Sequence, residues 1–210
     1  MNVGVLASGS GTNLQALLDR VHGRDGVAIV AVASDKPDAY ALSRAEAADV
    51  PTRVFPLSDY ADGGRAARDR AVADWLLERG VELVVLAGYM QLLSPEFLAR
   101  FPERVINVHP ALLPAFPGLA AVQQAIDYGV KVFGVTVHFV DDGVDSGAVI
   151  LQRAIEVPDV ADADAVLERL HPIEHELLPE AVRLIAQGVV RVDPAHPRRV
   201  LIDSGIGSDR

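Results

Sequence analysis

Short apolar runs alternate with longer amphipathic stretches along the first hundred residues, and this alternation limits the possible folds more than any other feature. Residues 3–7 are typical of a buried strand, and residues 13–21 of a helix with its leucines on one face. Strands that alternate with helices in this way form parallel sheets covered by helices. We therefore predict an α/β protein with a doubly wound, Rossmann-like fold, whose central sheet is mostly parallel with helices on both faces. The expected strands are 3–7, 27–33, 52–55, 83–87 and 105–108, and the expected helices are 13–21, 39–48, 65–79 and 95–100.

The pattern changes in the second half of the chain. Residues 131–140 and 148–157 are two strand-like runs with only seven residues between them, which suits an antiparallel hairpin or a wide loop and not a helical crossover. The sheet should therefore gain a mixed, antiparallel C-terminal extension. Residues 162–186 form the last expected helix, which Pro172 should interrupt because proline cannot donate the helical hydrogen bond. Residues 193–210 are expected to form a tail with at most one short strand.

Composition excludes several classes of site and partner. The chain has no cysteine, so disulfides, cysteine-ligated zinc, iron–sulfur clusters and thiol nucleophiles are excluded. Its 29 acidic and 19 basic residues give a net charge of −10, which argues against nucleic acid or an anionic membrane as partner. The apolar runs are shorter than the ~18 residues that span a bilayer, and the N-terminus resembles no secretory leader. We therefore expect a cytoplasmic protein that acts on small molecules.

Residues 8–13, Ser-Gly-Ser-Gly-Thr-Asn, join the first expected strand to the first expected helix. Glycines let the backbone approach a ligand, and the start of a helix offers free N–H groups at its positive end. A plain β–α turn capped by Thr12 or Asn13 is the alternative that the glycines alone leave open. Leu14 breaks the dinucleotide fingerprint, and no Gly-Lys-Ser/Thr follows as in a nucleotide-binding P-loop. The loop therefore favours a phosphomonoester such as a sugar phosphate.

Asn107 and His109 lie two residues apart at the carboxyl end of an expected strand, hence on the same face. Ligands bind at that end of open α/β sheets. Asparagine can stabilise an oxyanion, and histidine moves protons near neutral pH. The alternative is a pair that only satisfies the backbone of a loop. Three prolines and Gly118 stiffen the loop that follows, as expected for the wall of a pocket.

Three carboxylates crowd the loop between the two later strand-like runs: Asp141, Asp142 and Asp145. The first two are typical of solvated turn residues, and the spacing of a calcium-binding EF-hand loop is absent. Asp145 could instead face His109, where it would orient the imidazole ring and fix its tautomer. Asn107, His109 and Asp145 are therefore the candidate catalytic residues.

These motifs resemble those of the glycinamide ribonucleotide formyltransferases, folate-dependent enzymes of purine synthesis, in their single-domain bacterial type. The resemblance follows the family order over nearly the whole chain. The matching segments are 8–15 (SGSGTNLQ), 86–90 (LAGYM), 107–118 (NVHPALLPAFPG), 134–140 (GVTVHFV), 145–147 (DSG) and Glu174-His175. It implies one formyltransferase domain over residues 1–192, with a phosphate-binding half (1–100) and a catalytic and folate-binding half (101–192), followed by a C-terminal tail (193–210).

The resemblance also implies a one-carbon transfer in the de novo synthesis of purines (IMP). The amine of glycinamide ribonucleotide attacks the formyl carbon of 10-formyltetrahydrofolate and yields formylglycinamide ribonucleotide and tetrahydrofolate. Asn107 and His109 would bind the oxyanion of the tetrahedral intermediate, and His109 would deliver a proton to the leaving nitrogen. Asp145 would hold His109 charged and help relay the proton of the attacking amine. The folate is a co-substrate, no metal or redox cofactor is implied, and the protein would be a monomer or a homodimer.

Substrate contacts carry over by the same resemblance. Gly11, Thr12 and Asn13 would bind the phosphate of the ribonucleotide, and Glu174 its amino or ribose end. The folate site would be lined by Arg65, Met90, Gln91, Leu92, Leu93 and Asn107, together with the loop residues Val140, Asp141, Asp142, Gly143, Val144 and Asp145. Four positions depart from the family pattern: Gln91 stands in place of arginine, Ala120 and Val122 in place of polar residues, and His171 in place of glutamine.

Other functions stay open at this point. A sensor of sugar phosphates would keep the glycine-rich loop and make no product. Methionyl-tRNA formyltransferase and formyltetrahydrofolate hydrolase share the catalytic residues. The first normally has Arg-Gly in place of Pro117-Gly118 and a C-terminal RNA-binding domain, and the second has an N-terminal regulatory domain. Residues 171–175 also fit the spacing of an inverted zinc-protease motif, against which Pro172 argues.

Overall fold

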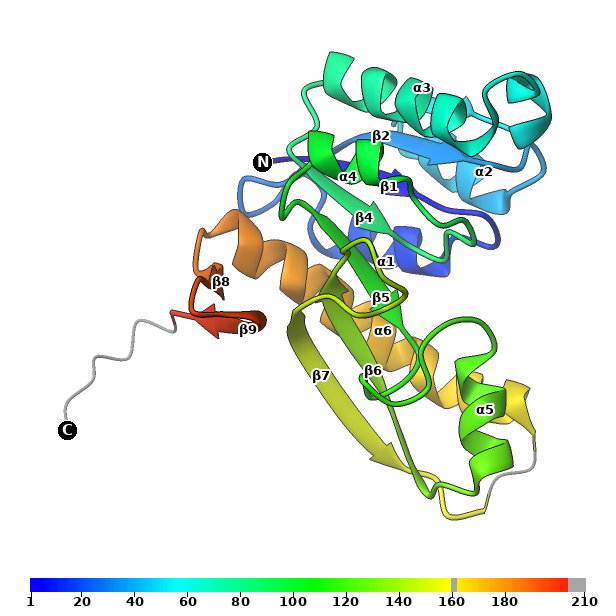
Figure 1. Ribbon diagram of the computed structural model, residues 1–210, viewed down its shortest axis with the longest axis vertical. Coiled ribbons are helices and arrows are strands. Elements are labelled where there is room, and N and C mark those ends of the chain that lie inside the picture. The colour runs from blue at the N-terminus through cyan, green and yellow to red at the C-terminus, as the bar shows by residue number, and fades with distance from the viewer. Residues whose placement is uncertain (160–161, 204–210) are drawn as a thin grey trace.

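One sheet of nine strands organises the chain (Figure 1). The computed structural model describes residues 1–159 and 162–203. The strands are β1 (Asn2–Leu6), β2 (Ala28–Ser34), β3 (Thr52–Val54), β4 (Leu83–Leu86), β5 (Val105–His109), β6 (Val132–Phe139), β7 (Val149–Glu156), β8 (Val190–Asp193) and β9 (His196–Ile202). The helices are α1 (Thr12–Arg20), α2 (Tyr40–Ala47), α3 (Gly64–Glu78), α4 (Pro95–Arg100), α5 (Ala121–Tyr128) and α6 (Ala163–Ala186), with a 3-10 turn, η1 (Leu57–Tyr60). None of these described helices is long and apolar enough to cross a bilayer.

The strand order across the sheet is β3-β2-β1-β4-β5-β6-β7-β9-β8. The first five strands in this order pair in parallel, whereas β5–β6 and β6–β7 pair in antiparallel fashion. The chain winds outward from β1 to β3, returns to β4 beside β1, and winds outward again in the other direction. This reversal is the doubly wound pattern, and ligands bind at the carboxyl ends of the strands where it occurs. The predicted α/β fold with its antiparallel C-terminal extension is confirmed.

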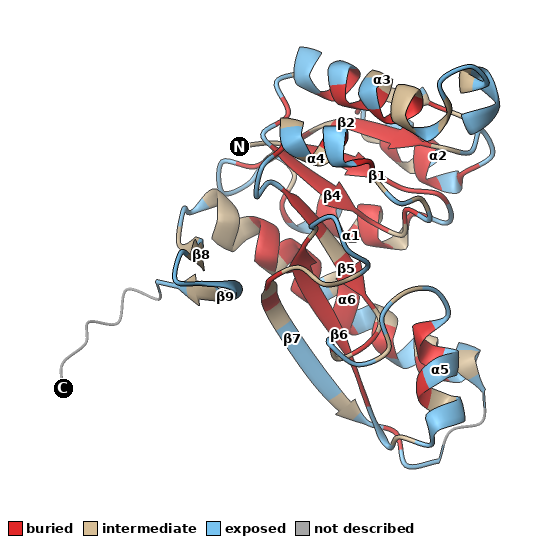
Figure 2. Cartoon of the chain, viewed as in Figure 1, coloured by how far each residue is buried: buried red, intermediate tan, exposed pale blue. Residues whose placement is uncertain are grey.

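Helices cover both faces of the sheet, and β4 shows how the sequence supports this. Leu83 and Val85 point into the core that contains α1 and α6, whereas Val84 and Leu86 point into the core that contains α3 and α4. The central strands are therefore buried along their length, while much of β7 is exposed (Figure 2). A strand buried on both faces needs apolar residues at every position, which explains the continuous apolar run of β4.

The last helix corrects one prediction. α6 runs without interruption through Pro172 and Pro179, so the break expected at Pro172 is wrong. Leu170 and Ile173 flank this proline, and both are buried in the same core. A proline removes one helical hydrogen bond, and the packing of a 24-residue amphipathic helix against the sheet offsets that loss.

The C-terminal residues form more regular structure than the sequence analysis predicted. β8 and β9 pair in antiparallel fashion, and Arg199 of β9 lies opposite Val149 of β7. The boundary expected after residue 192 therefore falls inside β8. The side chain of Val200 packs against the main core, which explains why this hairpin forms at the edge of the sheet. The remaining part of the expected tail, 204–210, lies outside the described residues.

Candidate active site

A cavity of about 280 Å³ lies at the carboxyl ends of the central strands. Its walls come from residues 9–13 of the glycine-rich loop, from the ends of β4 and β5, and from one face of α6. Val108 lines it from β5, one residue before His109, and His171 and Glu174 line it from α6. The candidate phosphate loop therefore borders the same space as the strand end that carries the candidate catalytic residues.

The glycine-rich loop has the backbone geometry of a ligand site at the start of a helix. Gly11 precedes α1 with a φ of 71°, and a Cβ at this position would lie 2.7 Å from Cα of Ala41. No side chain in the described ranges caps the first N–H groups of α1. These donors and the positive end of the helix dipole are therefore available to an anion in the cavity.

Asn13 and Glu174 connect this loop to α6. Nδ2 of Asn13 donates a hydrogen bond of 2.9 Å to Oε2 of Glu174, and both residues are buried. Burial raises the pKa of Glu174, while the hydrogen bond from Asn13 and the charges of His171 and His109 act in the opposite sense. Within the described residues, Oδ1 of Asn13 is buried without a hydrogen-bond partner. The cavity thus presents one buried acceptor and one buried carboxyl beside the start of α1.

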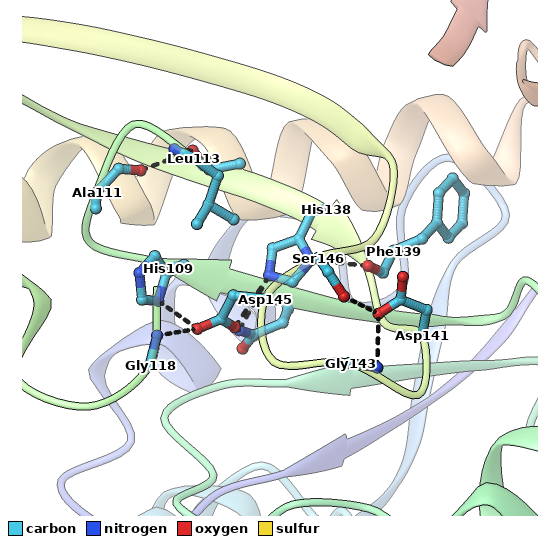
Figure 3. Close-up of polar contacts among 12 residues, drawn as sticks. His109, Ala111, Leu113, Gly118, His138, Phe139, Asp141, Gly143, Asp145 and Ser146 are labelled. Carbon is cyan, nitrogen blue, oxygen red and sulfur yellow. Dashed lines mark hydrogen bonds and ion pairs between the residues drawn. The ribbon is translucent and has the colours of Figure 1, made fainter. Parts of the chain in front are cut away.

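Asp145 is the centre of a polar cluster at the end of β5 (Figure 3). Its Oδ2 lies 3.4 Å from Nδ1 of His109 and accepts a hydrogen bond of 2.8 Å from the backbone N–H of Gly118. Its Oδ1 accepts a hydrogen bond of 3.3 Å from Nδ2 of Asn107. The structure therefore brings the three residues selected from the sequence together around one carboxylate, although Asp145 comes from the loop between β6 and β7.

His138 belongs to the same cluster, and the sequence analysis did not select it. It lies opposite Asn107 in the antiparallel pair of β5 and β6. Its Nε2 is 3.3 Å from Nδ2 of Asn107 and 3.5 Å from Oδ1 of Asp145. Its Nδ1 is 2.7 Å from the carbonyl oxygen of Phe139, which can only accept, so Nδ1 carries a hydrogen. The signal that could have found it is the register of two strands, which places position 138 directly beside position 107.

The cluster keeps Asp145 ionised. Burial alone raises the pKa of this carboxyl, but hydrogen bonds with His138 and Gly118 and the positive charges of His109 and His138 together lower it to about 2. Asp145 also has a φ of 49°, a left-handed conformation that is uncommon for residues other than glycine. The surrounding contacts therefore hold both the charge and the backbone of this residue.

The ring of His109 is fixed from two sides. Its Nε2 lies 2.9 Å from the carbonyl oxygen of Phe116, in the proline-containing loop after β5. Because a carbonyl only accepts, Nε2 carries a hydrogen in this geometry, and a hydrogen on Nδ1 would point at Asp145. Both ring nitrogens of His109 therefore face acceptors, and the amide of Asn107 beside them can donate a hydrogen bond.

The residues that the resemblance assigns to folate lie mainly in two loops. Met90 and Leu92 follow β4, and they are 59% and 56% exposed, so two large apolar side chains of this loop face solvent. Asp141 accepts hydrogen bonds within its own loop from the N–H of Gly143 and from Oγ of Ser146. This internal bonding agrees with a turn residue, so the structure adds no separate support for a folate contact through its side chain.

Other residues considered from the sequence have different positions. Arg65 is exposed on α3. Val122 is buried in the core, and Ala120 is exposed and precedes α5 with a φ of 56°. His171 does line the cavity.

The zinc-protease spacing of residues 171–175 does not assemble a metal site in the part of the chain that the structure describes. The rings of His171 and His175 stack with their centroids 6.2 Å apart. No three His, Asp or Glu side chains of the described residues converge as metal ligands would. Glu174, which lies between the two histidines, is bonded to Asn13 instead.

Comparisons with known proteins agree with this arrangement. A family model described as formyl transferase matches residues 1–182. Phosphoribosylglycinamide formyltransferase of Bacillus subtilis is 41% identical over 180 residues, which are 85% of this chain and 91% of that protein. The chain is also 41% identical to the trifunctional purine biosynthetic protein adenosine-3 of Chironomus tentans, but spans only 14% of its length. A crystal structure of glycinamide ribonucleotide transformylase 1 from Symbiobacterium toebii superposes with a TM-score of 0.91 at 47% identity, over 96% of this chain and 93% of that one. The chain therefore belongs to the formyl transferase family.

Proposed function

We propose that this protein transfers the formyl group of 10-formyltetrahydrofolate to the amine of N1-(5-phospho-D-ribosyl)glycinamide. The products are formylglycinamide ribonucleotide and tetrahydrofolate, in the de novo synthesis of purines. The observation that carries this proposal is the single carboxylate of Asp145, which meets both His109 and Asn107, while Val108 and Pro110 on either side of His109 line a cavity together with the glycine-rich loop. The similarity to phosphoribosylglycinamide formyltransferase over 91% of the bacterial relative supports the same activity.

The ribonucleotide would enter with its phosphate at the start of α1. Gly11, Thr12 and Asn13 offer backbone N–H groups there, at the positive end of the helix. Oδ1 of Asn13 and the carboxyl of Glu174 would then accept hydrogen bonds from the ribose hydroxyls or from the amine. This orientation would hold the amine near the end of β5, where the formyl carbon must lie for direct transfer.

The reaction itself is an attack of the amine nitrogen on the formyl carbon. A carbon–nitrogen bond forms, and the carbonyl electrons move to oxygen to give a tetrahedral oxyanion. Nδ2 of Asn107 would donate a hydrogen bond to this oxyanion, and Nε2 of His109 would donate another in place of its contact with the carbonyl oxygen of Phe116. Such donors are worth about 10²–10³ in rate. Collapse of the intermediate breaks the bond to N10 of the folate.

Protons must move in the opposite direction to the formyl group. His109 would give its proton to the leaving folate nitrogen, and the attacking amine would lose one by way of Asp145. The low pKa of Asp145 keeps its carboxylate charged beside His109, and this supports the role of His109 as the proton donor. His138 would hold Asp145 in place through its Nε2. No net oxidation or reduction occurs, so the chemistry requires no redox cofactor.

The folate would lie against the loops after β4 and β6. Exposed apolar side chains at Met90 and Leu92 support this placement, since a pterin ring requires an apolar wall. Arg65, Gln91, Leu93 and the loop from Val140 to Asp145 complete the proposed folate site. As an enzyme of purine synthesis, the protein would act in the cytoplasm on these two small molecules, as one domain and as a monomer or a homodimer.

A spectrophotometric assay tests the proposal. The protein is mixed with 10-formyl-5,8-dideazafolate, and deformylation is followed with and without glycinamide ribonucleotide. Deformylation that depends on the ribonucleotide would establish the transfer. Deformylation without it would indicate a hydrolase. A folded protein that binds the ribonucleotide but deformylates nothing would be a sensor, and the transfer would be wrong.

A further inference from the structure

Arg68 is the largest fully buried side chain, and it lies on α3 inside a polar network. Its Nε and one terminal nitrogen donate hydrogen bonds of 2.9 and 2.7 Å to Oδ1 of its neighbour Asp69, which is also fully buried. Oδ2 of Asp69 accepts a hydrogen bond of 2.7 Å from the backbone N–H of Ser94, the residue that caps α4. The buried ion pair therefore holds the end of the loop that joins β4 to α4.

Gln91 extends this network from the ion pair to a second carboxylate. Its Oε1 accepts a hydrogen bond of 3.1 Å from the other terminal nitrogen of Arg68. Its Nε2 donates a hydrogen bond of 3.0 Å to Oδ2 of Asp35. A side-chain amide suits this place, because it must accept from a cation on one side and donate to an anion on the other.

The network then returns to the loop from which Gln91 comes. Oδ1 of Asp35 accepts a hydrogen bond of 2.6 Å from Oγ of Ser8, and that oxygen accepts one of 3.0 Å from the N–H of Met90. The N–H of Ser8 also donates to the carbonyl oxygen of Gly88 at 3.1 Å. We call this set, Ser8, Asp35, Arg68, Asp69 and Gln91, the polar ring.

The loop from residue 88 to residue 94 has no helix or strand of its own. The polar ring fixes its backbone at the carbonyl of Gly88 and at the N–H groups of Met90 and Ser94. These contacts hold backbone atoms of the loop, whereas the side chains of Met90 and Leu92 are more than half exposed on its surface. The polar ring therefore fixes the position of the apolar surface formed by Met90 and Leu92, and it does so through buried charged groups.

The ring also joins this surface to the other proposed substrate site. Ser8 is the first residue of the glycine-rich loop, whose residues 9–13 line the cavity together with Met90. A displacement of the loop after β4 would change the distance between a folate on Met90 and a ribonucleotide phosphate at α1. Bound reactants must be aligned within a fraction of an ångström for efficient transfer, so this distance affects the reaction.

We propose that Gln91 and Arg68 are positioning residues, which hold the loop from 88 to 94 as the wall of the folate site and thereby set the affinity for the formyl folate. This inference rests on the proposed function. Neither side chain has to touch the folate for this effect, because both act through the backbone of the loop and through Ser8.

The substitution Gln91→Glu tests the ring with a minimal change in size. The new carboxylate still accepts from Arg68, but it faces Oδ2 of Asp35, and two like charges in a partly buried site repel. We expect the KM for the formyl folate to rise about tenfold or more, the scale of one lost charge-assisted hydrogen bond. The KM for the ribonucleotide should change by less than about twofold, because the start of α1 keeps its own contacts.

A second substitution should restore the ring. Asp35→Asn in the Gln91→Glu background gives position 35 an amide, whose oxygen accepts from Ser8 and whose nitrogen donates to the carboxylate at position 91. We expect the KM for the formyl folate to return to within about threefold of the original value. Gln123→Glu is the matched control, since Gln123 donates to Asp127 in the same way on the exposed surface of α5. This control should leave both KM values unchanged.

Hydrogen exchange gives a readout that needs no turnover. In Gln91→Glu, the amides of Met90 and Ser94 should exchange faster than in the original protein, and the second substitution should slow them again. An unchanged folate KM with unchanged exchange, an equal rise in both KM values, or a failure of Asp35→Asn to restore the folate KM would each overturn the inference. A protein without ribonucleotide-dependent deformylation would instead overturn the proposed function, and the role in folate affinity with it.

Discussion

Nδ2 of Asn13 donates a hydrogen bond of 2.9 Å to Oε2 of Glu174, across 161 residues of sequence. The bond joins the start of α1 to the middle of α6 at the cavity, where both side chains are buried. Burying a carboxylate is unfavourable unless hydrogen bonds compensate for the lost water. Glu174 therefore lowers the stability of the fold near neutral pH, which fits the role of substrate acceptor that we propose for it.

We expect Glu174→Gln to raise the melting temperature at neutral pH. Burial raises the pKa of Glu174 in the folded protein, so the stability linked to this carboxyl is fully present below its unfolded pKa of ~4.3. It is lost as the pH rises through the higher folded value. An amide carries no charge and still accepts from Asn13. Thermal unfolding followed by circular dichroism from pH 4 to pH 8 should show a gain for the variant that grows with pH.

Glu168→Gln is the control for this prediction, because Glu168 is exposed on the same helix. It should change the melting temperature little at any pH. The account of Glu174 would be wrong if Glu174→Gln were less stable than the original protein at pH 7.5. In the transfer assay, the same variant should also raise the KM for the ribonucleotide.

Gly11→Ala should destabilise the protein, whereas Gly9→Ala should not. A Cβ at Gly11 meets the backbone of Ala41, and its φ of 71° is unfavourable for alanine. Such strain costs about 1–3 kcal/mol. A Cβ at Gly9 meets no atom within 4 Å, so a change within about 0.5 kcal/mol is expected. Urea unfolding of both variants measures the difference, and equal midpoints would show that Gly11 is not constrained.

Asn107→Ala and His109→Ala should each reduce turnover by about a hundredfold or more, since each removes a donor to the oxyanion. Ribonucleotide-dependent deformylation measures this loss, and circular dichroism checks that the variants stay folded. His196→Ala is the control, because His196 is exposed on β9, in the hairpin at the edge of the sheet. Near-normal turnover in either active-site variant would remove that residue from the mechanism.

The predictions that succeeded depend on short-range patterns. The strand expected at residues 83–87 is β4, which is buried along its length in a sheet with helices on both faces, as predicted. The helix expected at residues 95–100 is α4, which Ser94 caps by accepting from the N–H of Phe97 through its Oγ. The i, i+2 spacing of Asn107 and His109 predicted a shared face, and both side chains do meet Asp145. Each of these follows from the geometry of one strand or one turn.

The features that were missed depend on contacts between distant residues. His138 enters the polar cluster around Asp145 through the register of β5 and β6. Gln91 was assigned to the folate site by resemblance, and the bridge that its side chain makes between Arg68 and Asp35 was not predicted, because no local pattern relates these residues. α6 continues through Pro172 because it packs against the sheet, and this packing does not follow from the sequence of the helix itself. α5 was not predicted, although its buried residues Ala121, Val122 and Ala125 follow the spacing of one helical face.

Asp145→Asn should make stability less sensitive to acid. The pKa of Asp145 is lowered from 3.8 to about 2 in the folded protein, so this carboxylate contributes stability above its unfolded pKa and loses it as the pH falls through the folded value. This lowering of the pKa corresponds to about 2.5 kcal/mol at most. The variant should therefore be less stable than the original protein at pH 5, and the difference in the free energy of unfolding should shrink towards pH 2. Urea unfolding at pH 5, 4, 3 and 2 measures this convergence.

Asp142→Asn alters an exposed carboxylate of the same loop and should differ from the original protein by less than about 0.5 kcal/mol throughout. A gap for Asp145→Asn that stays constant down to pH 2 would mean that lost packing, and not the charge that His109 and His138 stabilise, explains its effect.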